Sequence, residues 1–497
     1  MTPPAPDLAS AAALDALLQP GDALPAAFDR RQALMPMWGA RPVSPEERDA
    51  RWPRVAATPL ADQTLAYLHI PFCTSRCVFC GFYRNAWQKD AGAGYVDRLI
   101  AELAHEAALR PAGGSVTAVY FGGGTPTALS AADLGRLLRA VREHLPLSDD
   151  CEITIEGRIS HFTGDKIEAC LEAGANRFSI GIQTFDSTLR RRLGRQHGGE
   201  EAADYLRHLR QYDAVLVADL IFGLPSQDDA CWMRDISIAS DLGLDGLDVY
   251  AFNCYPSLPI NRLIEKGTLP PPQDLPTQAR HYAWAVRRLR DAGWQQLSNS
   301  HFGAASGRER NRYNSQVKSG LDCLAFGSGA GGQRGGLSYQ VNGELEAYLS
   351  TPASQKPFGF VSATSPNKAL FGAIQGQLET GRLDNALLAG NAEAEALLQA
   401  WHADGLLTRG ATEAQLSIGG RFWAPTMIRA LALTLEPYPD AMTARPAGMP
   451  HGHPGGARPG HPGAMPPGHP ASAPHGAGGR PIHTLHGEHP HAARKPD

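Results

Sequence analysis

The chain has 497 residues, more than one hydrophobic core usually serves, and 43% of them are apolar, so we expect a large catalytic domain with a smaller one appended. A formal net charge of −4 gives no overall electrostatic attraction for nucleic acid or a membrane surface. The eight cysteines do not have the regular spacing of a disulfide framework, which excludes a disulfide scaffold. No apolar run reaches membrane-spanning length, which excludes a membrane span. Together these features favour a cytoplasmic protein with reduced thiols.

Composition divides the chain into four parts. Residues 1–60 form an Ala- and Pro-rich N-terminal extension with the features of neither a secretory signal nor a transit peptide, and its apolar stretch RRQALMPMWG is expected to pack on the main domain. Residues 61–290 alternate short β-branched or aromatic runs with amphipathic helical patterns, in one of which Ser130 and Asp133 have capping-box spacing. The expected strands are residues 65–70, 118–123, 152–157, 177–183, 214–224 and 246–253, and two of the expected helices are residues 95–109 and 130–145.

Six strands, each followed by a helix, predict parallel βα units that close into a complete or partial barrel, an α/β fold whose chemistry lies on the loops after the strands. Residues 291–435 have a mostly helical pattern, which predicts a small helical or winged-helix domain. Residues 436–497 consist mainly of Gly, Pro, Ala and His, so we expect a disordered tail.

Three cysteines, Cys73, Cys77 and Cys80, begin three residues after the first expected strand, in YLHIPFCTSRCVFCGFY. A structural zinc site usually takes four ligands from two CxxC-like pairs, and the sequence has no second pair. A thioredoxin-like dithiol needs only two cysteines. Three thiolates with CxxxCxxC spacing suit three irons of a [4Fe–4S] cluster and leave the fourth iron without a protein ligand.

Polar and glycine-rich motifs follow the next strands. The segment from Gly122 to Pro126, GGGTP, allows a ligand to approach the backbone closely and offers amides and a hydroxyl for an amino-acid head group, although alone an ordinary turn is the more common explanation. Glu156, Gln183 and Asp219 lie at or near the ends of later strands. A single residue of this kind is more often a core or rim group whose hydrogen bonds are made within the protein. Beside an iron–sulfur cluster, the three together favour a shared functional site.

These motifs resemble the radical SAM superfamily and, within it, the HemN-like branch of oxygen-independent coproporphyrinogen dehydrogenases. The resemblance extends from about Tyr67 to Leu435 and is carried by Y-x-H-I-P-F-C-x3-C-x-F-C, GGGTPT, Glu156, NRFSIGIQTF, Arg195, DLIFGLP and LAFGSGAGG. It implies a partial (β/α) barrel followed by a HemN-like C-terminal domain. It also implies that S-adenosylmethionine (SAM) chelates the open iron, and that its reductive cleavage gives the 5′-deoxyadenosyl radical that starts the chemistry.

The resemblance also implies roles for individual residues. Cys73, Cys77 and Cys80 would ligate the cluster, with Tyr67 and His69 beside it as catalytic residues. The residues implied to contact SAM, with room for two SAM molecules, are Tyr67, Phe79, Gly123, Gly124, Thr125, Glu156, Gln183, Arg195, Asp219, Tyr255 and Gly331. Among them, Phe79 would lie near the adenine, Glu156 and Arg195 would pair with charged groups, and Gln183 and Asp219 would bind ribose hydroxyls. Arg suits a carboxylate because its planar fork binds both oxygens.

Departures from the branch pattern indicate a sub-family. Coproporphyrinogen dehydrogenases carry a further Cys two residues after the third ligand, where this chain has Phe82. HemW-like haem chaperones carry an HNxxYW signature and a His in the glycine-rich motif. This chain has RERNRYNSQ and FGSGAGG at these places and lacks both features. The combination of CGFYRN, EGRIS, GANRFSIGIQTF, RERNRYNSQVKSG and LAFGSGAGG resembles the anaerobic haem-degrading radical SAM methyltransferases of ChuW/HutW type. Those enzymes transfer a SAM-derived methyl group to haem, open the macrocycle without oxygen and release iron. The dehydrogenase and the chaperone remain alternatives.

The same resemblance implies haem as substrate and an electron donor such as a flavodoxin or a flavin reductase. His301, in SNSHFG, has two interpretations, a contact to a porphyrin propionate or iron, or a structural polar contact. Cys254 follows the sixth expected strand and is more often a buried hydrophobe than a residue facing the cavity. Histidines from His451 to His491 could bind divalent metal or store released iron or haem, although drifting low-complexity sequence is the more common explanation.

Overall fold

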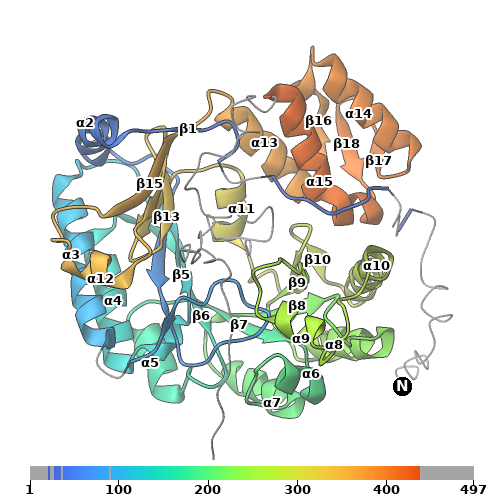
Figure 1. Ribbon diagram of the computed structural model, residues 1–497, viewed down its shortest axis with the longest axis horizontal. Coiled ribbons are helices and arrows are strands. Elements are labelled where there is room, and N and C mark those ends of the chain that lie inside the picture. Colours follow the sequence, from blue (N-terminus) through green and yellow to red (C-terminus); the bar gives the residue numbers. More distant parts are fainter. Residues whose placement is uncertain (1–20, 23–26, 35–36, 89–90, 437–497) are drawn as a thin grey trace, which may run out of the picture.

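The computed structural model describes residues 21–22, 27–34, 37–88 and 91–436 (Figure 1). The expected disordered tail with its histidines lies outside the described residues from 437 onward, and so do residues 1–20 of the expected N-terminal extension. In the described part of the chain, no helix is both long and apolar enough to span a membrane.

One sheet of 13 strands forms the body of the protein, in the order β1-β15-β14-β13-β12-β2-β5-β6-β7-β8-β9-β11-β10. The six expected strands are present at its centre, where they are parallel and follow one another in chain order. They are β2 (Thr64–Ile70), β5 (Val116–Gly123), β6 (Leu147–Gly157), β7 (Arg177–Gln183), β8 (Val215–Phe222) and β9 (Gly246–Ala251). Because β2 and β9 pair with further strands and not with each other, the barrel is partial, which confirms the expected fold class.

Helices line the outer side of the curved sheet (Figure 1). They are α3 (Ala91–Leu109), α4 (Ala131–His144), α5 (Gly164–Glu172), α7 (Gly199–Leu209), α8 (Asp229–Asp241) and α10 (Leu275–Asp291). The hydroxyl of Ser130 accepts the Asp133 N–H at 3.1 Å, so the expected cap of α4 is confirmed. On the inner side, α11 (Arg312–Lys318) packs Tyr313 against Tyr120 of β5, with ring centroids 4.8 Å apart.

The strands that extend the sheet differ from the helical pattern expected after residue 290. Beyond β9 lie β11 (His301–Gly303) and β10 (Gln295–Gln296), and beyond β2 lie β12 (Cys323–Phe326), β13 (Gly331–Arg334), β14 (Leu337–Val341), β15 (Phe358–Ala363) and β1 (Arg41–Pro42). With 2 to 6 residues each, these strands are too short to give a clear alternating pattern in the sequence. The sheet therefore continues past 290, and the proposed domain limits at 60, 290 and 435 stay predictions.

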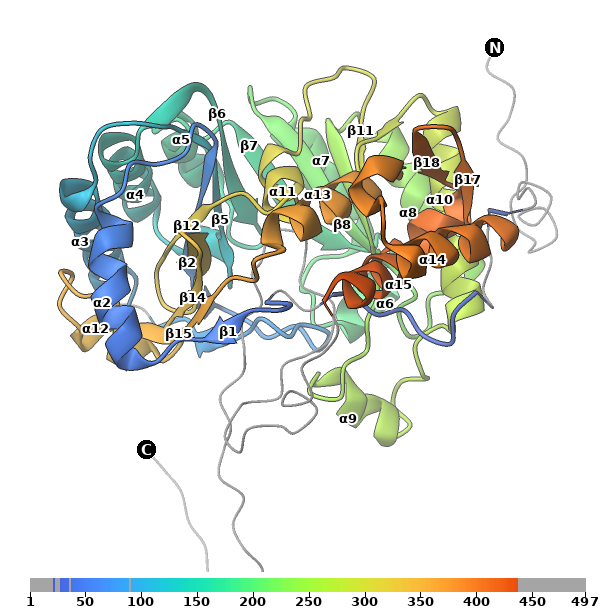
Figure 2. The same cartoon turned by 90° about the horizontal axis from the view of Figure 1, so that it is seen from above.

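The mostly helical part of the chain spans residues 368–435. It consists of α13 (Lys368–Glu379), α14 (Ala392–Ala403) and α15 (Ile418–Leu435) with the short antiparallel sheet β16 (Arg382–Asp384), β18 (Glu413–Leu416) and β17 (Leu407–Arg409). This combination matches the winged-helix alternative. Figures 1 and 2 show these helices beside α11 and α10, and Figure 2 shows α9 (Ile260–Glu265), which follows β9, standing out from the body.

The described part of the apolar stretch RRQALMPMWG packs on this helical part of the chain. The Arg31 Nε donates to the Phe422 carbonyl at 2.8 Å, and Trp38 is buried with Phe371 and Ala432. The Ser362 hydroxyl of β15 donates to Met37 Sδ at 3.5 Å. The stretch therefore contacts the main sheet, as expected, and also packs on α13 and α15. Further along, α2 (Pro45–Ala56) follows β1.

Candidate active site

The cysteine loop starts where β2 ends. It is closed by two short parallel strands, β3 (Phe72–Cys73) and β4 (Asn85–Ala86), which hold its ends together. Cys73 and Cys77 are buried, Cys80 is half-buried, and all three are free thiols. The loop therefore lies at the carboxyl end of a central parallel strand, where barrels of this kind place their chemistry.

Each of the three sulfurs receives a hydrogen bond. The Thr125 hydroxyl donates to Cys73 Sγ at 3.5 Å, the Arg158 guanidinium donates to Cys77 Sγ at 2.5 Å, and the Phe82 N–H donates to Cys80 Sγ at 3.3 Å. Burial raises the pKa of the Cys73 thiol, while Thr125 and Arg158 act in the opposite direction. Donors on all three sulfurs fit thiolates whose charge is shared with a metal.

The arrangement distinguishes between kinds of metal site. Among the described residues, no three His, Cys, Asp or Glu side chains lie close enough to hold one metal ion. A cluster makes a different demand, because each thiolate binds its own iron. The three cysteines therefore fit three irons of a [4Fe–4S] cluster. Sequence reasoning found the thiolates but missed Arg158, although it lies in the EGRIS motif.

The glycine motif at the end of β5 packs closely against the start of the cysteine loop and hydrogen-bonds to it. A Cβ on Gly123 would lie 2.5 Å from the His69 ring, and a Cβ on Gly124 would lie 2.4 Å from the Phe72 carbonyl oxygen. The N–H groups of Gly124 and Thr125 donate to the carbonyls of Ile70 and Phe72 at 2.7 and 2.8 Å. The space that these glycines leave is filled by protein atoms, so close packing explains them. A backbone contact to SAM stays a prediction.

Tyr67 and His69 form a buried pair on the inner side of β2. The Tyr67 hydroxyl lies 3.0 Å from His69 Nδ1, and the Tyr67 ring stacks on Tyr120 with centroids 6.5 Å apart. Tyr120 in turn donates to Glu156 Oε1 at 2.8 Å. Burial and the Glu156 carboxylate raise the pKa of Tyr120 well above its usual value, which keeps it a neutral donor. Tyr120 was missed, although it has an interior position opposite Tyr67 in the strand register.

Gln183 ends β7 in a left-handed conformation, with φ 74°. The fully buried Arg190, on α6 (Ser187–Arg192), donates through Nη1 to the carbonyls of Ile182 at 2.8 Å and Thr184 at 3.0 Å, on either side of Gln183. Burial lowers the pKa of Arg190 to about 10. A strained non-glycine residue held in place by a buried charge is typical of a functional site. Sequence reasoning could not find Arg190, since its role depends on where β7 ends.

The remaining candidates lie around this core of the site. Asp219 accepts the Ser179 hydroxyl at 3.1 Å. The guanidinium carbon of Arg195 lies 5.6 Å from the Phe79 ring centroid, so these two candidates contact each other. Tyr255 packs on the same apolar cluster as Phe79, and burial raises its pKa to about 12. Gly331 begins β13, after a loop whose Gly329 faces the His69 ring.

His301 belongs to a buried ionic network. Its Nδ1 lies 2.9 Å from Asp248 Oδ1 and its Nε2 lies 3.2 Å from Glu309 Oε1, while Arg177 donates to the second Glu309 oxygen at 2.9 Å. Burial lowers the pKa of His301, but the two carboxylates outweigh burial and raise it to about 9. Both ring nitrogens face carboxylates, which favours the structural interpretation of His301.

This network predicts a pH dependence of stability. In the folded protein the pKa of His301 is about 9, above its ordinary value of 6.5. The ion pairs of His301 therefore stabilise the fold fully below about pH 6.5, and this stabilisation is lost as the pH rises through 9. We expect the free energy of unfolding to fall by on the order of 3 kcal/mol over that interval, relative to a His301→Gln variant. Urea titrations at several pH values measure it, and parallel pH profiles of the two proteins would contradict it.

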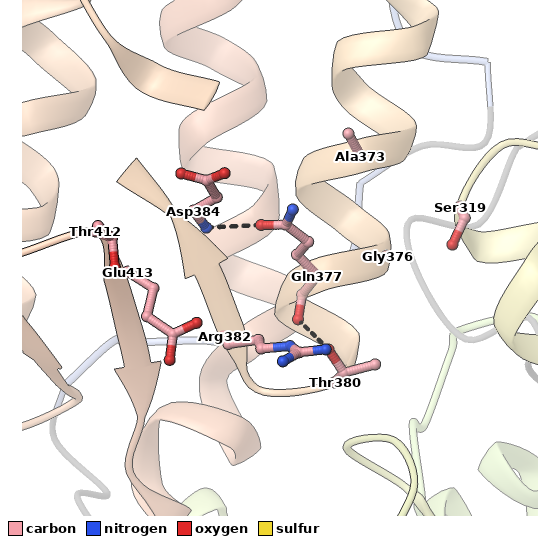
Figure 3. A pocket seen from close by; sticks show the side chains of 9 residues that line it. All are labelled: Ser319, Ala373, Gly376, Gln377, Thr380, Arg382, Asp384, Thr412 and Glu413. Carbon is pink, nitrogen blue, oxygen red and sulfur yellow. Dashed lines mark hydrogen bonds between the residues drawn. The ribbon is translucent and has the colours of Figure 1, made fainter. Parts of the chain in front are cut away.

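A pocket of about 530 Å³ lies in the helical part of the chain, between α13 and the β16–β18 pair (Figure 3). Gln377 Oε1 accepts the Asp384 N–H there at 2.7 Å, which ties α13 to β16. Its lining residues are Ser319, Ala373, Gly376, Gln377, Thr380, Arg382, Asp384, Thr412 and Glu413. It shares no residue with the candidate active site.

Comparisons with known proteins agree with this geometry. Residues 67–237 match the model of the radical SAM superfamily. The chain is 44% identical over 411 residues to an anaerobilin synthase of Escherichia coli O157:H7, covering 81% of this chain and 92% of that protein. It is 30% identical to the heme chaperone HemW of Bacillus subtilis, over 58% of this chain and 76% of the relative. Among solved structures, coproporphyrinogen III oxidase (HemN) of Escherichia coli shares the fold, with a TM-score of 0.67 at 24% identity over 80% of this chain and 96% of that one.

Proposed function

Because this chain belongs to the radical SAM family that includes the anaerobilin synthase of Escherichia coli O157:H7, we propose that it degrades haem without oxygen, transferring a SAM-derived methyl group, opening the porphyrin ring and releasing iron. The observation that carries the proposal is the loop of three free cysteines, each with a donor on its sulfur, in a chain that aligns with 92% of that synthase. The resemblance of CGFYRN, EGRIS and RERNRYNSQVKSG to haem-degrading methyltransferases supports haem as substrate.

As a radical SAM protein, the chain uses a [4Fe–4S] cluster and SAM. When bound, they supply a carbon-centred radical, because an electron from the reduced cluster cleaves the sulfonium of SAM. Cys73, Cys77 and Cys80 would each hold one iron. The donors from Thr125, Arg158 and the Phe82 N–H would stabilise negative charge on the three sulfurs and so favour the reduced state.

The SAM contacts that we propose follow from how each side chain is held. Glu156 is oriented by Tyr120, and Gln183 is fixed by Arg190, so both can present polar atoms without further ordering. Arg195 carries a planar fork that suits the SAM carboxylate. Asp219 would bind a ribose hydroxyl and Phe79 would lie against the adenine. Thr125, Gly123, Gly124, Tyr255 and Gly331 would supply the remaining contacts of one SAM or two.

Tyr67 and His69 are the catalytic residues of the proposal. Their hydrogen bond joins two buried groups that can share one proton, beside the strand end from which the cysteine loop starts. Burial of both side chains keeps bulk water from this side of the site, which protects reactive carbon species from side reactions.

The alternatives differ in their products. An oxygen-independent coproporphyrinogen III dehydrogenase would carry a cysteine where this chain has Phe82, and the likeness to HemN at 24% identity concerns the fold alone. A HemW-like chaperone would bind haem without consuming it.

We also propose that the protein is cytoplasmic and that its electron donor is a flavodoxin or a flavin reductase.

The products test the methyl transfer directly. Protein with a reconstituted cluster, an electron source, haem and SAM labelled with 13C in the methyl group should give a linear tetrapyrrole containing one labelled carbon, as measured by mass spectrometry under strict anaerobiosis. An opened ring without label would contradict methyl transfer while leaving ring opening intact. Release of carbon dioxide from propionates with a closed ring would support the dehydrogenase instead.

A further inference from the structure

Two buried charged side chains, from two different helices, hold the turn that follows β7. Arg190, on α6, donates to the carbonyl groups on either side of Gln183. Asp235, on α8, accepts the Phe185 N–H through Oδ1 at 2.6 Å, and both charged side chains are only 1% exposed. Between these attachments, Gln183 adopts its left-handed conformation, which persists only where the surrounding structure imposes it.

Asp235 is a buried carboxylate whose hydrogen-bond donors are uncharged. Besides the Phe185 N–H, these donors are Gln227 Nε2, at 3.4 Å from Oδ2, and the Thr184 hydroxyl. Among the residues that the structure describes, Asp235 makes no ion pair within 4.0 Å. Burial raises the pKa of Asp235 to about 7, and the Asp186 carboxylate adds to the rise, while the three donors act in the opposite direction.

The other ionisable groups around Asp235 lie on α6 and α8. Asp186 caps α6 and lies 3.8 Å from Arg234 of α8. Burial lowers the pKa of Arg190 only to about 10, partly because Asp235 raises it, so Arg190 stays charged at neutral pH. Burial raises the pKa of the Cys231 thiol above its usual range, so this thiol stays neutral. Asp235 is therefore the buried group of this set whose charge changes near neutral pH.

A pocket connects Asp235 to the outer side of the barrel. It has a volume of about 250 Å³, lies between α6 and α8, and is lined by Cys231 and Asp235 among others. Its lining also includes the exposed residues Thr188 and Arg234, so it is open to solvent. Because Gln183 is not one of its lining residues, protons from solvent reach Asp235 without passing through the proposed SAM site.

We propose that Asp235 is a positioning residue of the SAM site, whose carboxylate acts with Arg190 to hold the turn after β7 so that Gln183 keeps the conformation from which it binds SAM. The inference rests on the proposed function, because the contact between Gln183 and SAM belongs to that proposal. A neutral amide would accept the same N–H, so packing alone does not require a buried carboxylate here. Protonation of Asp235 weakens the hydrogen bond from Phe185 and removes a charge that attracts Arg190, and both changes loosen the turn.

The pH dependence of SAM affinity tests this role. If the form with ionised Asp235 is the one that binds SAM, its fraction falls from about 0.9 at pH 8 to about 0.1 at pH 6, and the Kd for SAM rises about tenfold. Asp235→Asn should therefore bind SAM about tenfold more weakly than wild type at pH 8 and equally well at pH 6. Asp241→Asn, which removes an exposed carboxylate from the same helix, is the matched control and should equal wild type throughout.

Calorimetry on full-length proteins with reconstituted clusters, under anaerobic conditions, measures each Kd at both pH values. Ionisation of SAM itself affects all the proteins alike, so the ratio of each variant's Kd to that of wild type is compared. Gln183→Ala provides a second profile, because it removes the side chain that Asp235 positions. This variant should bind SAM more weakly than wild type and lose the tenfold pH step, whereas a step caused by loosening of the whole fold would persist.

A ratio for Asp235→Asn that stays constant between pH 6 and pH 8 would overturn the positioning role, and so would a pH step that persists in Gln183→Ala. Urea titrations show whether Asp235→Asn is folded, and if it is not, the Gln183→Ala profile alone decides. A wild-type chain that binds no SAM at either pH would instead contradict the proposed function, and this role of Asp235 with it.

Discussion

Replacing any one of Cys73, Cys77 and Cys80 with serine is expected to abolish the [4Fe–4S] cluster. A serine hydroxyl stays protonated at neutral pH and is a poor iron ligand, and the site has only three protein ligands to lose. Anaerobic reconstitution followed by iron and sulfide analysis, together with the visible charge-transfer absorbance, measures the effect. The wild-type chain should hold one cluster and each variant almost none.

Cys254→Ser is the matched control for these variants. Cys254 is half-buried like Cys80, but its Sγ lies 3.2 Å from Asn261 Oδ1 beyond β9. The control should keep a full complement of iron. Normal iron content in any of the three loop variants, or its loss in Cys254→Ser, would contradict the assignment of the cluster ligands.

Replacing Arg195 with alanine is expected to weaken SAM binding by about 2 kcal/mol, roughly 30-fold in Kd, the usual effect of removing a hydrogen bond to a charged group. Arg195 contacts Phe79 and directly follows Gly194, which packs on the cysteine loop. This place beside the loop is why we propose that its guanidinium binds the SAM carboxylate. Arg195→Lys should recover part of the affinity, because it keeps the charge and loses the planar fork. Calorimetry on reconstituted protein measures both.

An exposed neighbour provides the control for Arg195. Arg192→Ala removes the same charge three residues earlier and should leave SAM affinity unchanged. If Arg195→Ala and wild type bind SAM equally well, Arg195 does not belong to the SAM site.

The parallel core was predictable because its signal is local. Each of β2, β5, β7 and β8 is a run of mostly apolar residues buried on both faces, and such runs stand out between amphipathic helices. The CxxxCxxC spacing was equally visible. The strands between 295 and 363 were not, because short strands at the edges of a sheet depend on pairing with neighbours that the sequence does not reveal.

The partners of the site residues were unpredictable for a related reason. Arg158 reaches Cys77 across 81 positions of sequence, and Tyr120 meets Glu156 only because β5 and β6 are neighbours. Gln183 has no local feature that indicates a left-handed conformation. His301 faces Asp248 because β11 pairs antiparallel with β9, outside the expected barrel.

The most direct test of the central claim is the fate of the haem ring. The full chain with its cluster reconstituted, given haem, SAM and an electron source without oxygen, should lose the intense Soret absorbance of haem while a ferrous chelator captures about one equivalent of iron. The Cys73→Ser/Cys77→Ser/Cys80→Ser variant should leave the Soret band unchanged. Intact haem after many equivalents of SAM cleavage by the wild-type chain would contradict haem degradation and favour the dehydrogenase or the chaperone.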